Sequence, residues 1–520
     1  MVLCAALALF GCRSFTVDTE VDAPDANPGD GKCARAVVAN SDGLTARVGR
    51  CTLRAAIQEA NATIWRDTIQ VPAGHYHLGL PAASGGGKLS ITRSVRIQGA
   101  GAATTIIEQG VSDIVVYIDA PAVEIAQVTV QNGNAQFGGG FRVEHGKLEL
   151  ADSVVRDNFG FTGGGGMLIN TGATAILRRV SILDNVAQGA FGGGILNKGE
   201  LWVHESTIAH NESNRAGGIR NEGNMNLRNV TVSGNQAVSP EAGTGGISQN
   251  GFAVLNNVTL TDNTGVGNFA GSFRGGGIQI VAGKTTVVKN SVIAGNHGGS
   301  GPNDCDGTLS GDSKYNLIGD SAGCTIPSYV ATFKLDVSPG LESLGNYGGP
   351  TQTHMLFNNS QALNAGYGFP PPAADACEHT DQRGIPRPQG AGGCDLGALE
   401  VTAANLWVTG FVLVDAAANT DLRPLLHGDT LDLSELPDQL SIRAVSSLGT
   451  GSVVFGLDGD ASFQTENVSP YALGGDAPLG DYTPVPFSAG DHTVTATPFT
   501  GAGGSGAAGG SKTITFHVQQ

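Results

Sequence analysis

Charged residues are scarce in this 520-residue chain: they make up 14 % of it, about half the usual share. Positive charge is the scarcer sign, with 29 Lys and Arg against 46 Asp and Glu and a formal net charge of −17. The sequence contains no dense run of Lys and Arg that could follow a phosphate backbone. These shortages argue against a nucleic-acid-binding protein and disfavour polyanionic partners in general.

Long hydrophobic runs are also missing, because no stretch after the N-terminus approaches 18 consecutive apolar residues. The apolar segment at 1–12, MVLCAALALFGC, is too short to span a bilayer and is typical of a processed export signal. Its last four residues, LFGC, resemble the lipobox of bacterial lipoproteins, in which the cysteine is acylated after cleavage. We therefore expect a secreted or cell-surface protein, with Cys12 as the candidate lipidation site of an outer-membrane lipoprotein and as its link to a membrane.

Metal-binding cysteine patterns are absent, since no two cysteines have C-x-x-C spacing and none has a histidine cluster beside it. The six cysteines that follow the leader instead fall into close pairs, and an even number suits an oxidising compartment. Six cysteines allow 15 pairings, and proximity in the chain favours one of them. The predicted disulfides are Cys33 with Cys51, Cys305 with Cys324, and Cys377 with Cys394.

Glycine is abundant, with 79 residues, and it recurs in a regular pattern. A glycine cluster followed by an apolar residue is found at 138–141, 164–167, 192–195, 217–219, 245–247 and 275–278. The apolar residues that end these clusters are 26, 28, 24, 28 and 31 residues apart. A repeat of this length indicates a solenoid in which each repeat forms one coil.

A second signature lies between the glycine clusters, as in VSILDN, STIAHN, VTVSGN, VTLTDN and SVIAGN. Each run alternates apolar and polar residues, which predicts short strands separated by turns and excludes a helical repeat. The expected inward column contains Val154, Ile182, Ile208, Val232, Leu260 and Ile293. The expected asparagine ladder contains Asn158, Asn185, Asn211, Asn235, Asn263 and Asn296, stacked at a coil spacing of about 4.8 Å.

The fold class that follows is all-β: a parallel β-helix with a helical N-terminal cap and a C-terminal immunoglobulin-like β-sandwich. The helix is expected over 53–60, where apolar residues have helical spacing beside a cysteine. The predicted domains are the export signal at 1–12, the β-helix with its N-terminal cap at 16–302, a disulfide-bearing C-terminal cap at 303–400 and the sandwich at 405–520.

Three segments carry a resemblance to known bacterial families. The run CTLRAAIQEAN at 51–61 resembles the motif of the CSLREA domain, from which it departs at Thr52 and Ala55. The glycine and asparagine repeats resemble polymorphic outer-membrane-protein repeats, and 346–400 resembles a choice-of-anchor Q domain. The resemblance implies a right-handed, pectin-lyase-like β-helix on the bacterial surface and implies no defined reaction.

The sharpest candidate for catalysis is the column directly before the ladder asparagines, which contains Asp157, Asp184, His210, Gly234, Asp262 and Gly295. Stacking in register would place two carboxylates and an imidazole, Asp157, Asp184 and His210, side by side, as acid–base chemistry requires. The competing interpretation is that Asp and Gly are ordinary turn residues at this position, which we favour.

Ligand contact is expected at Asp262, Phe137 and Phe191. The two phenylalanines directly precede glycine clusters, where their rings could stack on sugar rings or could instead shield the apolar core of the coil. No metal and no cofactor is predicted; calcium is conceivable at Asp458 and Asp460, but the spacing of a calcium loop does not continue. We expect an exported scaffold for adhesion whose partner is a polysaccharide or cell-surface glycan. The alternative is a carbohydrate-active enzyme, a polysaccharide lyase or glycoside hydrolase.

Overall fold

The computed structural model describes residues 13–34, 49–84, 86–189, 191–239, 243–265, 275–299, 301–326, 330–357, 360–368, 375–388, 393–401, 406–447, 450–477, 480–499, 501–506 and 508–519. The protein is all-β, with only 4 % helix. It divides into two compact units. The first is formed by Met1–Pro339, Ser343–His354 and Gln361–Glu400, and the second by Gly340–Glu342, Met355–Ser360 and Val401–Gln520.

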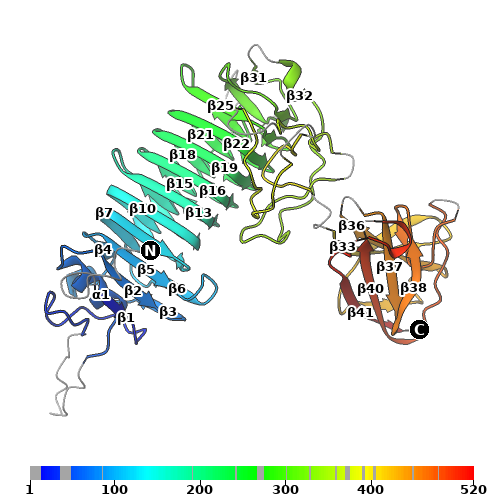
Figure 1. Ribbon diagram of the computed structural model, residues 1–520, viewed down its shortest axis with the longest axis horizontal. Helices are drawn as coiled ribbons and strands as arrows, with labels where there is room; N and C mark the ends of the chain where they lie inside the picture. The colour runs from blue at the N-terminus through cyan, green and yellow to red at the C-terminus, as the bar shows by residue number, and fades with distance from the viewer. Residues whose placement is uncertain are drawn as a thin grey trace. The chain divides into compact units, whose positions relative to one another are not determined.

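The first unit is a parallel β-solenoid of about nine turns, visible as a stack of arrows in Figure 1. Its larger sheet has 24 strands. The early ones are β1 (Ser14–Thr16), β2 (Asp67–Val71), β3 (Gly74–Leu78), β4 (Leu89–Ile91), β5 (Val95–Gly99), β6 (Thr105–Gln109), β7 (Val116–Ala126), β8 (Thr129–Gln131), β10 (Phe141–Arg156), β12 (Met167–Ile169) and β13 (Thr174–Leu183). The later ones are β15 (Ile195–Asn197), β16 (Glu200–Ala209), β18 (Ile219–Asn221), β19 (Asn224–Ser233), β21 (Ile247–Gln249), β22 (Phe252–Thr261), β24 (Ile278–Ile280), β25 (Thr285–Lys289), β26 (Val292–Ile293), β29 (Cys305–Thr308), β30 (Leu317–Ile318), β31 (Cys324–Thr325) and β32 (Lys334–Leu335).

A second sheet of eight strands runs along the same stack. It contains β9 (Asn134–Phe137), β11 (Phe159–Gly163), β14 (Val186–Ala187), β17 (Glu212–Ser213), β20 (Gln236–Ala237), β23 (Thr264–Gly265), β27 (His297–Gly298) and β28 (Gly301–Pro302). The parallel pairing continues past residue 302, because β29 pairs with β24, β30 with β26 and β32 with β30. The solenoid therefore includes the first part of the segment 303–400.

The inward column is the apolar core of the coils. Ile182, Ile208, Val232 and Leu260 are paired in register from coil to coil, and all are fully buried. The prediction of Val154 in this column is wrong, since Val155 pairs with Ile182 and is buried. Side chains alternate between the two faces of a strand, so an error of one residue exchanges inside for outside.

The glycine clusters mark a place where successive coils approach closely. A Cβ at Gly166 would lie 2.8 Å from the carbonyl oxygen of Gly194, and one at Gly194 would lie 2.8 Å from that of Gly218. The backbones are joined there by hydrogen bonds, such as Gly166 N to Gly193 O at 3.1 Å. Only glycine fits such an approach, which explains the period that the sequence displays.

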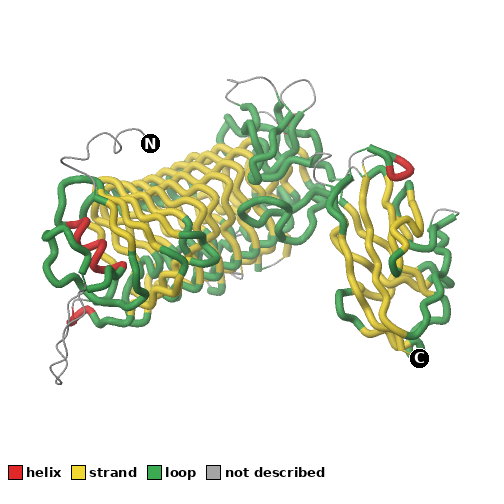
Figure 2. The backbone as a smooth tube through the Cα atoms, turned by 60° about the horizontal axis from the view of Figure 1, so that its bottom comes forward, coloured by secondary structure: helices red, strands yellow, loops and turns green. Residues whose placement is uncertain are grey.

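Helix α1 (Leu53–Asn61) begins at Thr52, whose hydroxyl accepts a hydrogen bond from Ala55 N at 3.0 Å. Its buried face, with Leu53, Ala56 and Ile57, belongs to the same core cluster as the first strands. Figure 2 shows this helix at the end of the stacked strands. The described part of this unit also contains the short 3₁₀ helices η1 (Ala82–Ser84) and η2 (Val330–Thr332).

The second unit contains two mainly antiparallel sheets. One has the order β34 (Thr420–Leu425), β33 (Val408–Asp415), β36 (Leu440–Ser446) and β39 (Tyr471–Ala472). The other has the order β35 (Thr430–Asp432), β41 (Lys512–Gln519), β40 (Gly490–Phe499), β37 (Ser452–Leu457) and β38 (Asp460–Glu466), with η4 at Ala502–Gly504. Phe411 from the first sheet and Phe455 and Phe516 from the second belong to one buried cluster, so the sheets share a core.

Candidate functional site

The predicted acidic column is a corner of the solenoid at which the backbone is left-handed. Asp157, Asp184, His210 and Asp262 have φ between 54° and 57°, and all are exposed. The column continues in the same conformation through Gly234, at 65°, and Gly295, at 76°. Asp, Asn and Gly are the residues that tolerate this conformation most easily, so the corner itself accounts for the recurrence of Asp and Gly.

Stacking does bring the polar side chains of this column within electrostatic reach of one another. Partial desolvation raises the pKa of Asp184. The positive charges of His210 and Arg156 oppose this shift, and the Asp157 carboxylate reinforces it. Asp157 is also 3.6 Å from the guanidinium of Arg156. No direct hydrogen bond joins the side chains of Asp157, Asp184 and His210, which are all described residues. The column is thus a row of neighbouring charges without the bonded pair that a general base and its partner form.

The asparagines next to this corner form the predicted ladder. Asn211 Nδ2 donates to Asn235 Oδ1 at 2.9 Å, and Asn185 Nδ2 donates to Asn211 Oδ1 at the same distance. Each ladder asparagine also satisfies backbone carbonyls, such as Ile182 O for Asn211 at 3.0 Å. The ladder ends on Asp304, which accepts from Asn296 Nδ2 at 2.8 Å. These side chains are buried and fully engaged, so they are structural.

A second left-handed corner precedes the first one by five residues and was not predicted. It contains Gln127, Asp152, Arg179, Glu205, Asn229, Asn257 and Asn290. The residue types differ from coil to coil, so composition does not reveal the column. The constant separation of five residues from the first corner is the signal that could have revealed it. Arg179 links three half-buried members of the corner, donating to Asp152 at 2.6 Å and approaching Glu205 at 3.5 Å.

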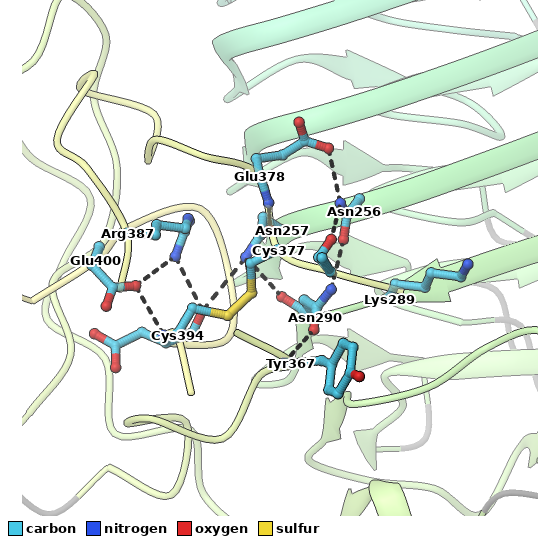
Figure 3. Close-up of a disulfide and its surroundings, with 12 residues drawn as sticks. Asn256, Asn257, Lys289, Asn290, Tyr367, Cys377, Glu378, Arg387, Cys394 and Glu400 are labelled. Atoms are coloured by element: carbon cyan, nitrogen blue, oxygen red, sulfur yellow. Dashed lines mark hydrogen bonds and ion pairs between the residues drawn. A yellow bond between two sulfur atoms is a disulfide. The ribbon is translucent and has the colours of Figure 1, made fainter. Parts of the chain in front are cut away.

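The later part of this second corner is covered by described residues of 351–354 and 361–400, which lie along the side of the solenoid (Figure 3). Asn257 Nδ2 donates to Gly397 O at 3.2 Å, and Glu378 N donates to Asn257 Oδ1 at 2.9 Å. Asn290 Nδ2 donates to Asp375 O at 2.8 Å. We refer to the described residues of 351–354 and 361–400, which belong to the first unit, as the side cover. It takes up corner groups that would otherwise face solvent.

The side cover contains a buried ion pair and a disulfide. Arg387 Nη1 lies 2.9 Å from Glu400 Oε2, and Arg387 Nη2 also donates to Gly397 O at 2.8 Å. Burial raises the pKa of Glu400 to about 7, the Asp395 carboxylate adds to the shift, and Arg387 opposes it. The disulfide joins Cys377 to Cys394, whose Cα atoms are 6.6 Å apart. These contacts explain why this loop-rich segment has a defined shape without regular strands.

The other two predicted cysteine pairs are also joined. Cys33 and Cys51 have Cα atoms 4.8 Å apart, and Cys305 and Cys324 have Cα atoms 5.3 Å apart. Cys12 lies outside the described residues. No helix in the described part of the chain is long and apolar enough to cross a membrane.

The predicted aromatic ligand positions are both half-buried. Phe191 is covered by the guanidinium of Arg220, whose Cζ is 4.8 Å from the ring centroid. Phe137 ends strand β9 and pairs with Gly163 of the next coil. Phe161, by comparison, is 58 % exposed and makes an edge-on contact with Phe159 at 5.7 Å. The structure does not bring Phe137, Phe191 and Asp262 into a common pocket among the residues it describes.

Metal ligation has little basis in the described residues, where no cluster of three or more His, Cys, Asp and Glu side chains is arranged around a common point. His75 and His77 share one face, but both turn to Glu108, at 3.4 and 3.0 Å from its Oε1. Asp458 accepts from Thr493 N at 2.8 Å and contacts His492 Nδ1 at 2.6 Å. Its carboxylate is therefore already engaged within the C-terminal unit.

A shallow groove lies on the outer face of the solenoid and was not predicted from the sequence. It has a volume of about 230 Å³ and is lined by Glu200, Trp202, Asn224, Asn226 and Phe252. Trp202 is 38 % exposed and Phe252 is 44 % exposed. Both occupy outward positions in the alternation of their strands. This alternation is the signal from which their exposure could have been predicted.

The chain was compared with protein families, curated proteins and solved structures. None of them matches it.

Proposed function

We propose that this protein is an exported bacterial cell-surface scaffold that holds the cell in contact with glycans or with other cells. The observation that carries the proposal is the pairing of all six described cysteines, 33 with 51, 305 with 324 and 377 with 394. Disulfides persist in oxidising compartments outside the cytoplasm. A lipid attached to Cys12 would anchor such a protein at the outer membrane.

The stacked coils support a mechanical role. Their core is a continuous apolar column, and the asparagine ladder joins successive coils through buried hydrogen bonds. Such a solenoid is a rigid scaffold, and the outer faces that the side cover leaves open are available for binding. We further propose that α1 and the Cys33–Cys51 disulfide cap the first coil and that the coils are right-handed. We propose that the C-terminal unit is an immunoglobulin-like accessory module, and that the protein is of the CSLREA and choice-of-anchor Q type.

The alternative, a polysaccharide lyase or glycoside hydrolase, has less support. Its candidate residues Asp157, Asp184 and His210 occupy corner positions that favour Asp and Gly for conformational reasons. The same corner is continued by Gly234 and Gly295, which have no side chain to offer. We therefore assign this column to the turn of the coil.

Two measurements test the proposal. Fractionation of the bacterium, with protease treatment of whole cells and mass analysis of the N-terminal peptide, should find the chain at the surface and acylated at Cys12. A chain retained in the cytoplasm with free thiols contradicts the proposal. Incubation with neutral and acidic polysaccharides should give binding without shorter products. Cleavage that is lost in the Asp157→Ala/Asp184→Ala/His210→Ala variant would establish the enzyme instead.

A further inference from the structure

The groove on the outer face is built by three neighbouring strands of the larger sheet. Strands β16, β19 and β22 are paired in register, so that Glu200, Asn224 and Phe252 form one outward row. Trp202 and Asn226 belong to the adjacent outward row, and the strands lie side by side in Figure 1. Successive coils are about 4.8 Å apart, so the strands that carry Trp202 and Phe252 are separated by about 10 Å. The strand between them carries the amides Asn224 and Asn226.

The two aromatic rings of the groove are placed as a binding platform. Large apolar side chains that are exposed singly need no explanation, but here Trp202 and Phe252 frame the same hollow. Their inward neighbours Leu201 and Ala253 already fill the core of the coils. The rings therefore add nothing to the packing of the solenoid interior, and both side chains remain partly exposed at the groove.

Polar groups for a hydroxyl-rich ligand lie between the rings. Asn226 Oδ1 accepts from Arg228 Nε at 3.0 Å, which orients the amide and leaves its NH₂ group as a donor. Within the described part of the chain, the side chains of Glu200 and Asn224 and the indole N–H of Trp202 have no hydrogen-bond or ion-pair partner. The groove thus offers donors, acceptors and two aromatic faces, which is the combination that sugar rings require.

The charge of the lining selects the kind of glycan. Glu200 is the one charged residue that lines the groove, and no Lys or Arg is among its lining residues. The nearest cation along the strand, Arg228, is engaged by Asn226 and lies 3.5 Å from Glu378. A chain with a net charge of −17 adds further repulsion for an acidic polymer.

We propose that this groove is a binding site for a neutral polysaccharide. One pyranose ring stacks on Trp202 and another, further along the polymer, stacks on Phe252. Hydroxyl groups between them bond to Asn224, Asn226 and Glu200. The inference rests on the proposed function, because it names the class of glycan that the scaffold contacts and the surface that contacts it.

The test uses the mature chain in solution with a panel of soluble neutral glucans, mannans and xylans and of uronate polymers. Binding is measured by calorimetry and by affinity electrophoresis for the wild type, Trp202→Ala, Phe252→Ala and Asn226→Ala. Phe161→Ala is the matched control, because it removes an exposed ring on another face of the same solenoid. Circular dichroism and thermal unfolding verify that each variant is folded.

We expect at least one neutral polymer to bind, with affinity falling about tenfold for each ring removed and unchanged in Phe161→Ala. Binding that persists in Trp202→Ala/Phe252→Ala overturns the groove assignment and leaves the proposed function intact. Tighter binding of uronate polymers than of neutral polymers overturns the assignment to a neutral polysaccharide. Self-association of the wild type that Trp202→Ala abolishes also overturns the proposal, because the groove would then be an interface between copies of the chain. A surface-exposed protein that binds no glycan on the panel overturns this inference alone, whereas a cytoplasmic protein overturns the proposed function.

Discussion

The imidazole of His210 lies across the backbone of Gly234 on the next coil. A Cβ at position 234 would be 2.6 Å from Cδ2 of His210, closer than real Cβ contacts, and 3.0 Å from Nε2. Gly234 also has a φ of +65°. The corner therefore accommodates a bulky ring on one coil because the coil beside it has no side chain, and neighbouring corner positions are not independent.

This relationship predicts a coupled pair of substitutions. Gly234→Ala should lower the free energy of unfolding by about 1–2 kcal/mol from the left-handed backbone alone, and by more because His210 must move. The loss should be smaller in a His210→Ala background, which a double-mutant cycle in urea measures.

Gly283→Ala is the control for this cycle, because Gly283 has a φ of +80° and nothing within 4 Å of its Cβ position. Its loss should match the Gly234→Ala loss in the His210→Ala background. Equal losses for Gly234→Ala in both backgrounds would show that His210 does not occupy the space over Gly234.

The asparagine ladder predicts a large cost for one interior amide. Asn211→Ala removes the acceptor of Asn185 N and Nδ2 and the donor to two carbonyls, all of them buried. Asn185 Nδ2 and Ala209 O keep other partners, so two groups, Asn185 N and Ile182 O, lose the bond that Asn211 supplies. Buried groups left without partners cost about 1–3 kcal/mol each, so we expect a loss of about 2–6 kcal/mol in chemical unfolding. Asn214→Ala, at a partly exposed asparagine of the same coil, should cost less than about 1 kcal/mol. Similar losses for the two variants would contradict a structural ladder.

His204 predicts a loss of stability in acid. Burial lowers its pKa to about 4, and the neighbouring guanidinium groups of Arg178 and Arg228 add to the shift. In the unfolded chain the group titrates near 6.5, so the unfolded state binds more protons between pH 6.5 and 4. The contribution of neutral His204 to the free energy of unfolding is therefore complete above pH 6.5 and decreases as the pH falls towards 4.

Thermal unfolding between pH 7.5 and 4 tests this, with His204→Asn as the variant that cannot titrate. The wild type should lose more stability than His204→Asn over this window. Arg178→Gln removes one of the two positive charges and should reduce the difference. Parallel pH profiles for the wild type and His204→Asn would show that this histidine is solvated in the folded protein.

The side cover predicts local opening when its disulfide is removed. Cys377 and Cys394 are 17 residues apart in the chain, and a crosslink of that length contributes about 3 kcal/mol. In Cys377→Ser/Cys394→Ser, peptides from 375–388 should exchange amide hydrogens faster and be cleaved first by protease, while the coils at 174–261 remain protected. The control Cys33→Ser/Cys51→Ser should loosen the N-terminal segment instead. Global unfolding without local opening would show that the cover and the coils form one cooperative unit.

The sequence by itself determined the solenoid. Glycine clusters, alternation and ladder asparagines have short-range causes that repeat in every coil, so the period, the ladder and the cysteine pairs could be inferred without coordinates. The inward column was wrong only at Val154, where two adjacent valines fit the alternation equally well and only the offset to Asn158 separates them.

Only the tertiary structure decided the second corner, the side cover and the groove. The corner residues Arg179, Glu205 and Asn229 share a backbone conformation but no chemistry, so composition does not reveal them. The side cover depends on contacts between residues far apart in the chain, such as Asn257 with Gly397. Trp202 and Phe252 lie in different rows and different repeats, and they line one groove because stacking in register places their strands two coils apart.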